Sequence, residues 1–361
     1  MGRPHRVGVV GLGVIWAQYR ATLVGHPEVA VTAVADLDEA RAHEAAAGID
    51  GARALSTEQL VADEAVDTVL NLTIPAAHAS VALAALAHGK NVYGEKPLAA
   101  TDAEAAAILA ARDSAWVGAA PDTVLGTGVQ TARAVVDSGE LGRPVAASAT
   151  WLSAGHESWH PNPDFYYRAG GGPLLDMGPY YLTALVHLLG PVERVAAEAS
   201  RSRAERVIAS GPRAGEVIPV EVATHVAGTL VHRGGAISTV QFGFDAPWTT
   251  AAPIEVHGER GSMLVPDPNL FAGDVRVRAV DEPDWRLVPP SAGYLDAGRG
   301  IGLIDFLRGG GRADGPLAAH VLEIMTGLLA SAEDHRAHPV TTTVERPDPV
   351  PLTPRAGGWD A

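Results

Sequence analysis

One lysine, Lys96, stands where it could do chemistry. It lies near the end of the stretch His88–Leu98, HGKNVYGEKPL, in which residues 91–93 have the length and apolar character of a short buried strand. Pro97 prevents continuation as an inner strand, so the lysine lies just past the strand end. Ligands of open parallel sheets bind beyond the carboxyl ends of the strands, which makes Lys96 a candidate site residue.

Lysine is scarce in this chain. The chain contains two lysines, Lys90 and Lys96, and 25 arginines, so a lysine at position 96 is unusual for this sequence. Because arginine cannot lose its proton and has a different shape, this choice indicates a chemical or geometric demand for lysine. The alternative is a solvated loop charge, which is the default for an exposed lysine, but the sheet context favours a site.

A glycine-rich turn follows the first expected strand, Val7–Val10. The segment 11–16, GLGVIW, stands between this strand and a helical stretch, as a dinucleotide-binding fingerprint does. Trp16 occupies the place where a third small residue normally lets helix and strand pack closely, so an ordinary strand-to-helix turn is the alternative. The candidate cofactor contacts in this turn are Gly11, Gly13, Val14 and Ile15.

Asp36 strengthens the dinucleotide hypothesis. It follows the expected strand Val29–Ala35, 23 residues after Gly13, where a carboxylate can bind both hydroxyls of an adenosine ribose. An Asp before a helix can also be only an N-cap. Residues 37–39 provide no arginine, so a 2′-phosphate would meet carboxylates without a cation. We therefore expect NAD as the cofactor, with NADP disfavoured.

The segment 156–160, HESWH, matches the HExxH pattern with which zinc peptidases hold a metal on a helix. Here Pro161 and Pro163 follow at once, and Ser153-Ala154-Gly155 precedes. These residues favour a loop, in which nothing guarantees that two histidines four residues apart lie one helical turn apart, so no metal site is predicted.

The same segment is rich in aromatic residues. Trp151, Trp159, Tyr166 and Tyr167 surround the two histidines in the sequence. Aromatic faces with hydrogen-bonding groups at their edges suit a polyhydroxylated ring, whereas an aromatic core with surface histidines explains the same composition equally well. On the first interpretation, the candidate substrate contacts are His156, His160 and Tyr166.

A third group of candidates follows the glycine run Gly170-Gly171-Gly172. The run leads into a helix whose first turn tolerates Pro179, and Asp176 and Tyr180 are four residues apart, so their side chains share one side of the helix start. A carboxylate and a phenol then converge. Taken singly, Asp176 is as consistent with an N-cap as with a catalyst, and Tyr180 with a packed ring.

The elements that must position these groups change character along the chain. The first third alternates short β-branched runs with Ala-rich helical ones, which indicates βαβ units and a parallel sheet. Ser56 with Gln59 and Thr101 with Glu104 fit capping boxes. The expected strands are Val7–Val10, Val29–Ala35, Thr68–Leu72, Asn91–Tyr93 and Trp116–Ala119.

From about Thr123 a long helical stretch to Ser138 is expected, and thereafter strands dominate. Two pairs of strands flank glycine-containing turns and predict hairpins of an antiparallel sheet. Two helices close the chain. These elements are a strand over Val145–Trp151, hairpins of Glu221–His232 with Ala236–Phe244 and Ile254–His257 with Ser262–Val265, and helices over Ile301–Leu307 and Leu317–His335.

Length and composition limit the function. The 361 residues with 47% apolar content predict two domains with sizeable cores. A formal charge of −15 and the absence of a Lys/Arg run oppose a nucleic-acid partner, and zero cysteines exclude disulfides and thiolate metal sites. The start, MGRPHR, lacks the features of a signal peptide, and we find no apolar run of membrane-spanning length, so a soluble cytoplasmic protein is expected.

Taken together, the motifs resemble those of the glucose-fructose oxidoreductase/inositol dehydrogenase (Gfo/Idh/MocA) family over nearly the whole chain. The most specific element is the triplet Glu95-Lys96-Pro97 combined with the downstream Asp and proton donor four residues apart. The matching residues, in order, are Gly11-x-Gly13, Asp36, Thr73-Ile74-Pro75 with His78, Gly89-Lys90, Glu95-Lys96-Pro97 and Gly171-Gly172 with Asp176-x-Gly178-x-Tyr180.

The resemblance implies roles for these positions. The lysine would contact the reacting hydroxyl and the nicotinamide, and Asp176 would complete the site with Tyr180, which replaces a His as in the glucose-fructose oxidoreductase and dimeric dihydrodiol dehydrogenase branches. Thr73, Pro75, His78 and Glu95 join the candidate cofactor contacts, and Asp122 joins the candidate substrate contacts. A homodimer or homotetramer formed through the C-terminal sheet is also implied.

We therefore expect an α/β protein with an NAD-binding Rossmann domain at 1–122. A substrate-binding and oligomerisation domain at 123–361 would contain a mostly antiparallel open sheet and the C-terminal helices. The expected function is hydride transfer between NAD(P) and a secondary alcohol of a sugar, glycoside or cyclic polyol. An NAD-dependent glycosidase that oxidises its substrate transiently, and a non-catalytic sugar or nucleotide sensor, are the alternatives on the same scaffold.

Overall fold

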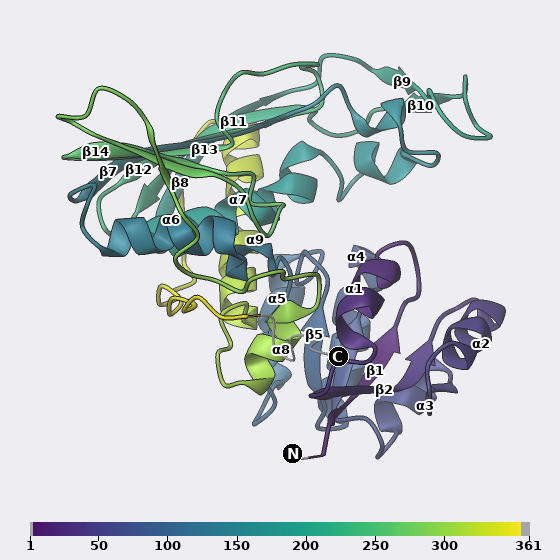
Figure 1. The fold of residues 1–361 in the computed structure, drawn as a ribbon. Helices are drawn as coiled ribbons and strands as arrows, with labels where there is room; N and C mark the ends of the chain where they lie inside the picture. Colours follow the sequence, from purple (N-terminus) through teal and green to yellow (C-terminus); the bar gives the residue numbers. More distant parts are fainter. Residues whose placement is uncertain (1–2, 355–361) are drawn as a thin grey trace. The chain divides into compact units, whose positions relative to one another are not determined.

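The computed structural model describes residues 3–354, and the chain forms two compact units (Figure 1). Described residues of 3–126, 292–322 and 347–354 make the first unit, and Thr127–Ser291 with Glu323–Arg346 make the second. The predicted division at residue 122 differs from this grouping because C-terminal segments return to the first unit. One reason is that the buried Asp122 carboxylate accepts the N–H groups of Gly300 and Gly302 at 2.7 and 3.1 Å.

The first unit contains a six-stranded parallel sheet in the order β3-β2-β1-β4-β5-β6. This order reverses direction between β1 and β4, as in a Rossmann fold. The strands are β1 His5–Val10, β2 Val29–Ala35, β3 Arg53–Ala54, β4 Thr68–Asn71, β5 Asn91–Gly94 and β6 Val117–Ala119. The helices are α1 Trp16–Leu23, α2 Glu39–Ala47, α3 Thr57–Ala62, α4 Pro75–Ala87, α5 Asp102–Ala111 and α8 Ile301–Leu307, with a 3-10 turn at Thr123–Leu125.

Local signals in the sequence determine these elements well. Both predicted capping boxes are present, at Ser56 with Gln59 and at Thr101 with Glu104, so α3 and α5 begin where expected. The strand β3 was not predicted because two residues carry no periodic pattern. The predicted Rossmann-type parallel sheet is confirmed.

The second unit contains a nine-stranded sheet in the order β16-β15-β14-β13-β7-β12-β11-β8-β17. All its pairs are antiparallel except β7 with β12, and both predicted hairpins are present. Its strands are β7 Pro144–Leu152, β8 Val192–Ser200, β11 His225–His232, β12 Ile237–Gly243, β13 Ile254–Gly258, β14 Gly261–Val265, β15 Val275–Ala279, β16 Arg286–Val288 and β17 His338–Pro339. A separate small hairpin pairs β9 Glu205–Val207 with β10 Val217–Pro219.

Two helices, α6 Thr127–Asp137 and α7 Pro173–Leu189, lie on one side of this sheet (Figure 1). The predicted helix 123–138 is interrupted at Gly126, before which the chain forms a 3-10 turn. The helix α7 begins at Pro173, because Gly172 adopts a φ of 97° and proline is well suited to the first helical position. Pro179 therefore lies inside α7, and its predicted place in the first turn is wrong.

The last helix, α9 Gly315–Asp334, has residues in both units. Its 20 residues pass a test of length and mean hydropathy for a membrane span, but a single buried core helix passes the same test. Inside the protein, however, 56% of its most apolar stretch is buried, as in the core helix of a globular domain.

Candidate active site

The register of three strands brings the predicted cofactor residues together. Val10, Asn71 and Gly94 lie side by side at the carboxyl ends of β1, β4 and β5. The glycine turn after β1, the segment after β4 and Lys96 after β5 therefore meet at the same edge of the parallel sheet. This is the edge at which open α/β sheets bind ligands, next to the point where the strand order reverses.

The turn after β1 has the space that a pyrophosphate requires. Gly11 has a φ of 93°, and a Cβ there would lie 2.7 Å from the backbone of Leu72, so only glycine fits. A Cβ at Gly13 would meet no atom within 4 Å, which leaves open space in front of the turn. Val14 is 93% exposed beside it, whereas Trp16 is buried as the first residue of α1. The turn fits a dinucleotide.

Asp36 is fixed by the backbone rather than used as a helix cap. Its carboxylate accepts the N–H of Leu12 at 2.7 Å and that of Asp38 at 2.9 Å. The N-cap of α2 is Asp38, which accepts the N–H of Arg41, so the alternative interpretation of Asp36 as the N-cap is wrong. The carboxylate is thus held against the glycine turn, where a ribose can reach it.

Arg41 is a neighbour of Asp36 that the sequence analysis missed. Its Nη1 lies 3.3 Å from the Asp36 carboxylate, and its Nη2 lies 3.3 Å from Asp38. The absence of an arginine from residues 37–39 was therefore a misleading signal, because the first turn of α2 returns residue 41 to the strand end. The available clue was that Arg41 falls in the first turn of the helix that follows Asp36.

Lys96 is half-buried and follows a carboxylate that the protein orients. Glu95 is 9% exposed, accepts the hydroxyl proton of Tyr19 at 2.8 Å and accepts the Lys96 backbone N–H at 3.0 Å. Burial, followed by the charge of Glu95, raises the pKa of Tyr19, which therefore stays a hydrogen-bond donor. Glu95, a predicted cofactor contact, thus binds the backbone N–H of Lys96 in this structure.

Another predicted residue, His78, is buried behind the sheet edge. His78 is 1% exposed, and its ring nitrogens lie 2.6 Å from the Pro97 carbonyl oxygen and 3.0 Å from that of Thr73. His78 therefore links the segments after β4 and β5, while Thr73 itself bonds to Asn71 and Pro75 begins α4.

Asp122, predicted to bind substrate, is not exposed at all. It is 0% exposed, and burial raises the pKa of its carboxyl group. Its carboxylate accepts the backbone N–H groups of residues 300 and 302 and so holds this segment in place. This buried position does not agree with the predicted contact between Asp122 and the substrate.

In the second unit, Asp176 and Tyr180 lie on consecutive turns of α7, as predicted. The N-cap of this helix is Gly172, so Asp176 is not the cap, and its backbone N–H donates to the Gly172 carbonyl at 3.1 Å. The Tyr180 side chain is 6% exposed. Positions four apart lie on one face of a helix, so Asp176 and Tyr180 share a face of α7.

His156 adds a contact that spacing did not reveal. Its Nε2 lies 2.8 Å from a carboxylate oxygen of Asp176, and the pair is largely buried. Its ring also lies 4.2 Å from that of Tyr166 and 4.8 Å from that of Phe244, measured between ring centroids. The predicted group of His156, Asp176 and Tyr166 is thus brought together.

The HExxH segment is not a zinc helix. It forms a 3-10 turn at His156–Ser158, and Glu157 is paired with the buried Arg206 at 2.7 Å. Arg206 also pairs with Asp245, so one buried guanidinium holds the segment against two other parts of the unit. Among residues 3–354, no group of three or more His, Asp or Glu side chains has the arrangement of a metal site.

Comparison with known proteins agrees with both sheets. Residues 5–118 match the model described as "Oxidoreductase family, NAD-binding Rossmann fold", and residues 129–264 match the GFO/IDH/MocA C-terminal domain. The crystal structure of an NAD-binding oxidoreductase from Klebsiella pneumoniae has the same fold. It has a TM-score of 0.80 at 22% identity and covers 94% of this chain and 99% of its own.

Two relatives of known activity extend the likeness. A dTDP-3,4-didehydro-2,6-dideoxy-alpha-D-glucose 3-reductase from Streptomyces antibioticus is 29% identical over 81% of this chain and 85% of its own length. A myo-inositol 2-dehydrogenase from Thermotoga maritima is 26% identical over 76% and 77% respectively. With its two domains matched in order, the chain belongs to the GFO/IDH/MocA family of oxidoreductases, whose N-terminal domain is an NAD-binding Rossmann fold.

Proposed function

We propose that this protein transfers hydride between a nicotinamide dinucleotide and a secondary alcohol carbon of a sugar, glycoside or cyclic polyol. The observation that carries the proposal is the common sheet edge that unites the glycine turn and Lys96, with Asp36 held against that turn. The activities of the relatives support the substrate class, since one reduces a dTDP-linked deoxysugar and another oxidises myo-inositol.

Lys96, Asp176 and Tyr180 are proposed to act on the same alcohol. When bound, the nicotinamide supplies the hydride acceptor. Tyr180 takes the hydroxyl proton as the carbon is oxidised, and returns it in the reverse direction. A tyrosine has a reference pKa of about 10, so a nearby ammonium group is needed to favour its phenolate form. Lys96 supplies that charge and also holds the substrate oxygen.

Asp176 has a different proposed role. Its carboxylate is held by His156 at 2.8 Å and so keeps a defined orientation. A fixed negative charge stabilises the positive charge that develops as hydride leaves the alcohol. His156 is thus a positioning residue for Asp176 and, with His160 and Tyr166, a proposed substrate contact.

A screen of alcohol substrates tests this function. The purified protein is mixed with NAD and with sugars, glycosides, cyclic polyols or aromatic dihydrodiols, and NADH is followed by its absorbance. We expect net NADH formation with at least one sugar or polyol. Cleavage of a glycoside without net NADH would instead identify a glycosidase. Binding without any chemistry would identify a sensor, an outcome that the proton donor Tyr180 argues against.

The cofactor preference is proposed to be NAD over NADP, and the substitution Asp36→Ala should reverse it. Loss of the carboxylate removes the acceptor for the ribose hydroxyls and leaves Arg41, now without Asp36, beside the 2′ position. Charge-assisted hydrogen bonds of this kind are worth about 1.5–3 kcal/mol, so we expect NADH affinity to fall and NADPH affinity to rise by about tenfold each. Titration of the cofactor fluorescence gives both dissociation constants.

The matched control is Asp36→Ala combined with Arg41→Ala. This double variant should lose the gain in NADPH affinity while its NADH affinity stays low. If the unmodified protein binds NADPH more tightly than NADH, the proposed role of Asp36 is wrong.

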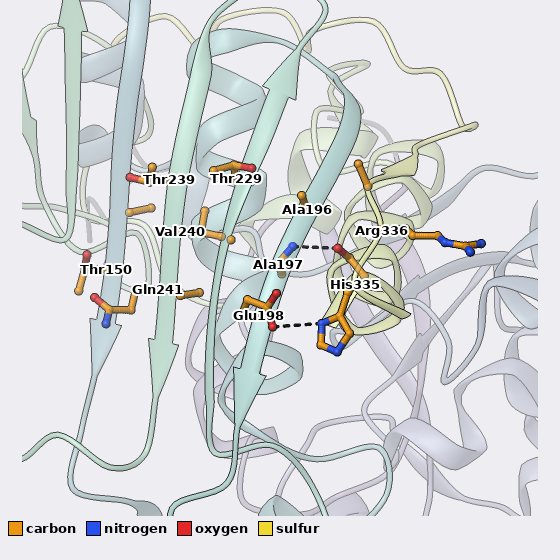
Figure 2. Close-up of a pocket in the computed structure, with 15 residues that line it drawn as sticks. Thr150, Ala196, Ala197, Glu198, Thr229, Thr239, Val240, Gln241, His335 and Arg336 are labelled. Carbon is orange, nitrogen blue, oxygen red and sulfur yellow. Dashed lines mark hydrogen bonds and ion pairs between the residues drawn. The ribbon is translucent and has the colours of Figure 1, made fainter. Parts of the chain in front are cut away.

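We further propose a homodimer or homotetramer that uses the sheet face opposite α6 and α7. Thr229 on β11 pairs with Thr239 on β12, and both are exposed. Two residues further along β12, Gln241 pairs with Thr150 on β7. These residues line a groove of about 630 Å³, which Figure 2 shows together with the ion pair between His335 and Glu198 at 3.4 Å. The small and uncharged side chains of Thr150, Thr229 and Thr239 suit sheet packing, and Glu198, His335 and Arg336 also line the groove.

Thr239→Arg should therefore lower the oligomer to a monomer, because a charge would be buried at the contact. Sedimentation equilibrium measures the mass. Val207→Arg, on the separate β9–β10 hairpin, is the matched control and should leave the mass unchanged. A monomeric unmodified protein would refute the proposal.

A further inference from the structure

We propose that the aromatic segment 156–166 forms a subsite for a second sugar ring, so that the substrates include disaccharides or other glycosides. This inference rests on the proposed function. It adds that the enzyme recognises the sugar unit attached to the one that is oxidised.

The first observation is exposure. Trp159 is 59% exposed and Phe165 is 56% exposed, although large aromatic side chains are normally buried. Both belong to one continuous set of rings: the centroids of Trp159 and His160 are 5.3 Å apart, those of His160 and Phe165 are 5.6 Å apart, and those of Phe165 and Tyr166 are 4.0 Å apart. Clustered exposed rings mark a binding surface better than isolated ones do.

The second observation is a hydrogen-bond donor between the two exposed rings. The His160 Nδ1 accepts the backbone N–H of Asn162 at 3.1 Å, so the proton of the neutral ring is on Nε2. Desolvation lowers the pKa of His160, which favours this neutral form. Within the described part of the chain, Nε2 has no hydrogen-bond partner, so its N–H is available to a ligand hydroxyl. Aromatic faces that flank such a donor suit a sugar ring.

The third observation is rigidity. The buried Glu157 accepts hydrogen bonds from both Arg206 and Tyr167, and Arg206 is itself paired with Asp245. The segment is therefore held by charge-assisted bonds at its base, while Trp159 stays exposed. A surface ordered in advance loses less conformational entropy when it binds a ligand.

The local charges favour a neutral ligand over a nucleotide-linked sugar. Asp164 is paired with Arg213 and lies 3.8 Å from Arg168, and Arg213 also pairs with Glu216. The two arginines and two carboxylates balance, so these four described residues leave no surplus cation among themselves for a diphosphate. This distinguishes the surface from the site that a dTDP-linked sugar would require.

The subsite adjoins the proposed catalytic residues. His156 connects them, since its ring centroid lies 5.2 Å from that of Trp159 and its Nε2 lies 2.8 Å from Asp176. A ring bound over Trp159 is therefore next to the sugar unit on which Asp176 is proposed to act. Covalently linked rings would occupy both positions together.

The experiment compares matched ligands with the protein saturated in NADH, so that binding is measured without turnover. Calorimetric titrations use glucose with maltose and cellobiose, and dTDP-glucose as the nucleotide-linked ligand. We expect at least one disaccharide to bind about tenfold more tightly than glucose, since two aromatic contacts and one hydrogen bond contribute. Trp159→Ala should remove most of this difference and change glucose affinity less than twofold.

The matched control is Trp248→Ala, which removes another exposed tryptophan (90% exposed) outside the set of ring contacts given above. It should leave every affinity unchanged. The inference is overturned if no disaccharide binds more tightly than glucose, if Trp159→Ala weakens glucose and disaccharides equally, or if only dTDP-glucose gains affinity. Failure of the proposed function is separate, because it appears as the absence of NADH formation with any alcohol.

Discussion

Replacing Tyr180 by phenylalanine should lower turnover about 10²–10⁴-fold while NADH binding is unchanged. The substitution removes only the phenol oxygen that is proposed to accept the hydroxyl proton, and general acid–base catalysis contributes about this factor. The ring, which is 6% exposed on α7, keeps its packing. Steady-state turnover with the best alcohol of the screen measures the loss, and titration with NADH measures binding.

Tyr181→Phe is the matched control on the same helix. Its hydroxyl lies 3.2 Å from Asp267 within the second unit, and the side chain is 1% exposed. Burial raises the pKa of Tyr181, and this tyrosine has no proposed part in proton transfer, so its variant should keep turnover. Near-normal turnover in Tyr180→Phe would contradict the assignment, and His156 or His160 would become the next proton carrier to test.

Lys96→Ala should lower turnover at least as much as Tyr180→Phe. The lysine is proposed both to hold the substrate oxygen and to favour the phenolate, so its removal affects two steps of the same proton transfer. Lys96→Arg should not restore turnover, because a planar guanidinium keeps the charge but differs from the ammonium group in shape and cannot hold the substrate oxygen in the same place. The measurement is again turnover at saturating NAD.

The other lysine of the chain provides the control. Lys90 donates to the carbonyl oxygens of Asp63 and Val66 at 2.9 Å, away from the end of β5. Lys90→Ala should keep turnover after correction for any loss of stability. If Lys96→Ala and Lys90→Ala lose equal amounts, the lysine after β5 has no catalytic role.

The double variant Lys96→Ala/Tyr180→Phe tests whether the two residues act together. Groups that act as a unit lose most of their effect when either is removed, so the double variant should be little slower than the slower single variant. If the loss of turnover in the double variant equals the product of the two single losses, the two residues act independently.

Local sequence determined most of the first unit and the positions of its candidate residues. Capping boxes, short apolar strands and the glycine turn depend on neighbours within a few residues, so they can be recognised from the sequence alone. The place of Lys96 followed from the same logic, because a strand end followed by proline fixes which edge of a parallel sheet a residue occupies. Asp176 and Tyr180 were likewise paired by helical spacing alone.

Tertiary structure decided the contacts between residues distant in sequence. The pairing of His156 with Asp176, the burial of Glu157 against Arg206 and the enclosure of Asp122 by residues 300–302 join segments that are 20 to 180 residues apart. No periodicity encodes such contacts, because they depend on which surfaces pack once the helices and strands exist. For that reason the sequence named the candidate groups, whereas only the folded chain showed that Asp122 is fully buried on backbone N–H groups and that Asp176 pairs with His156.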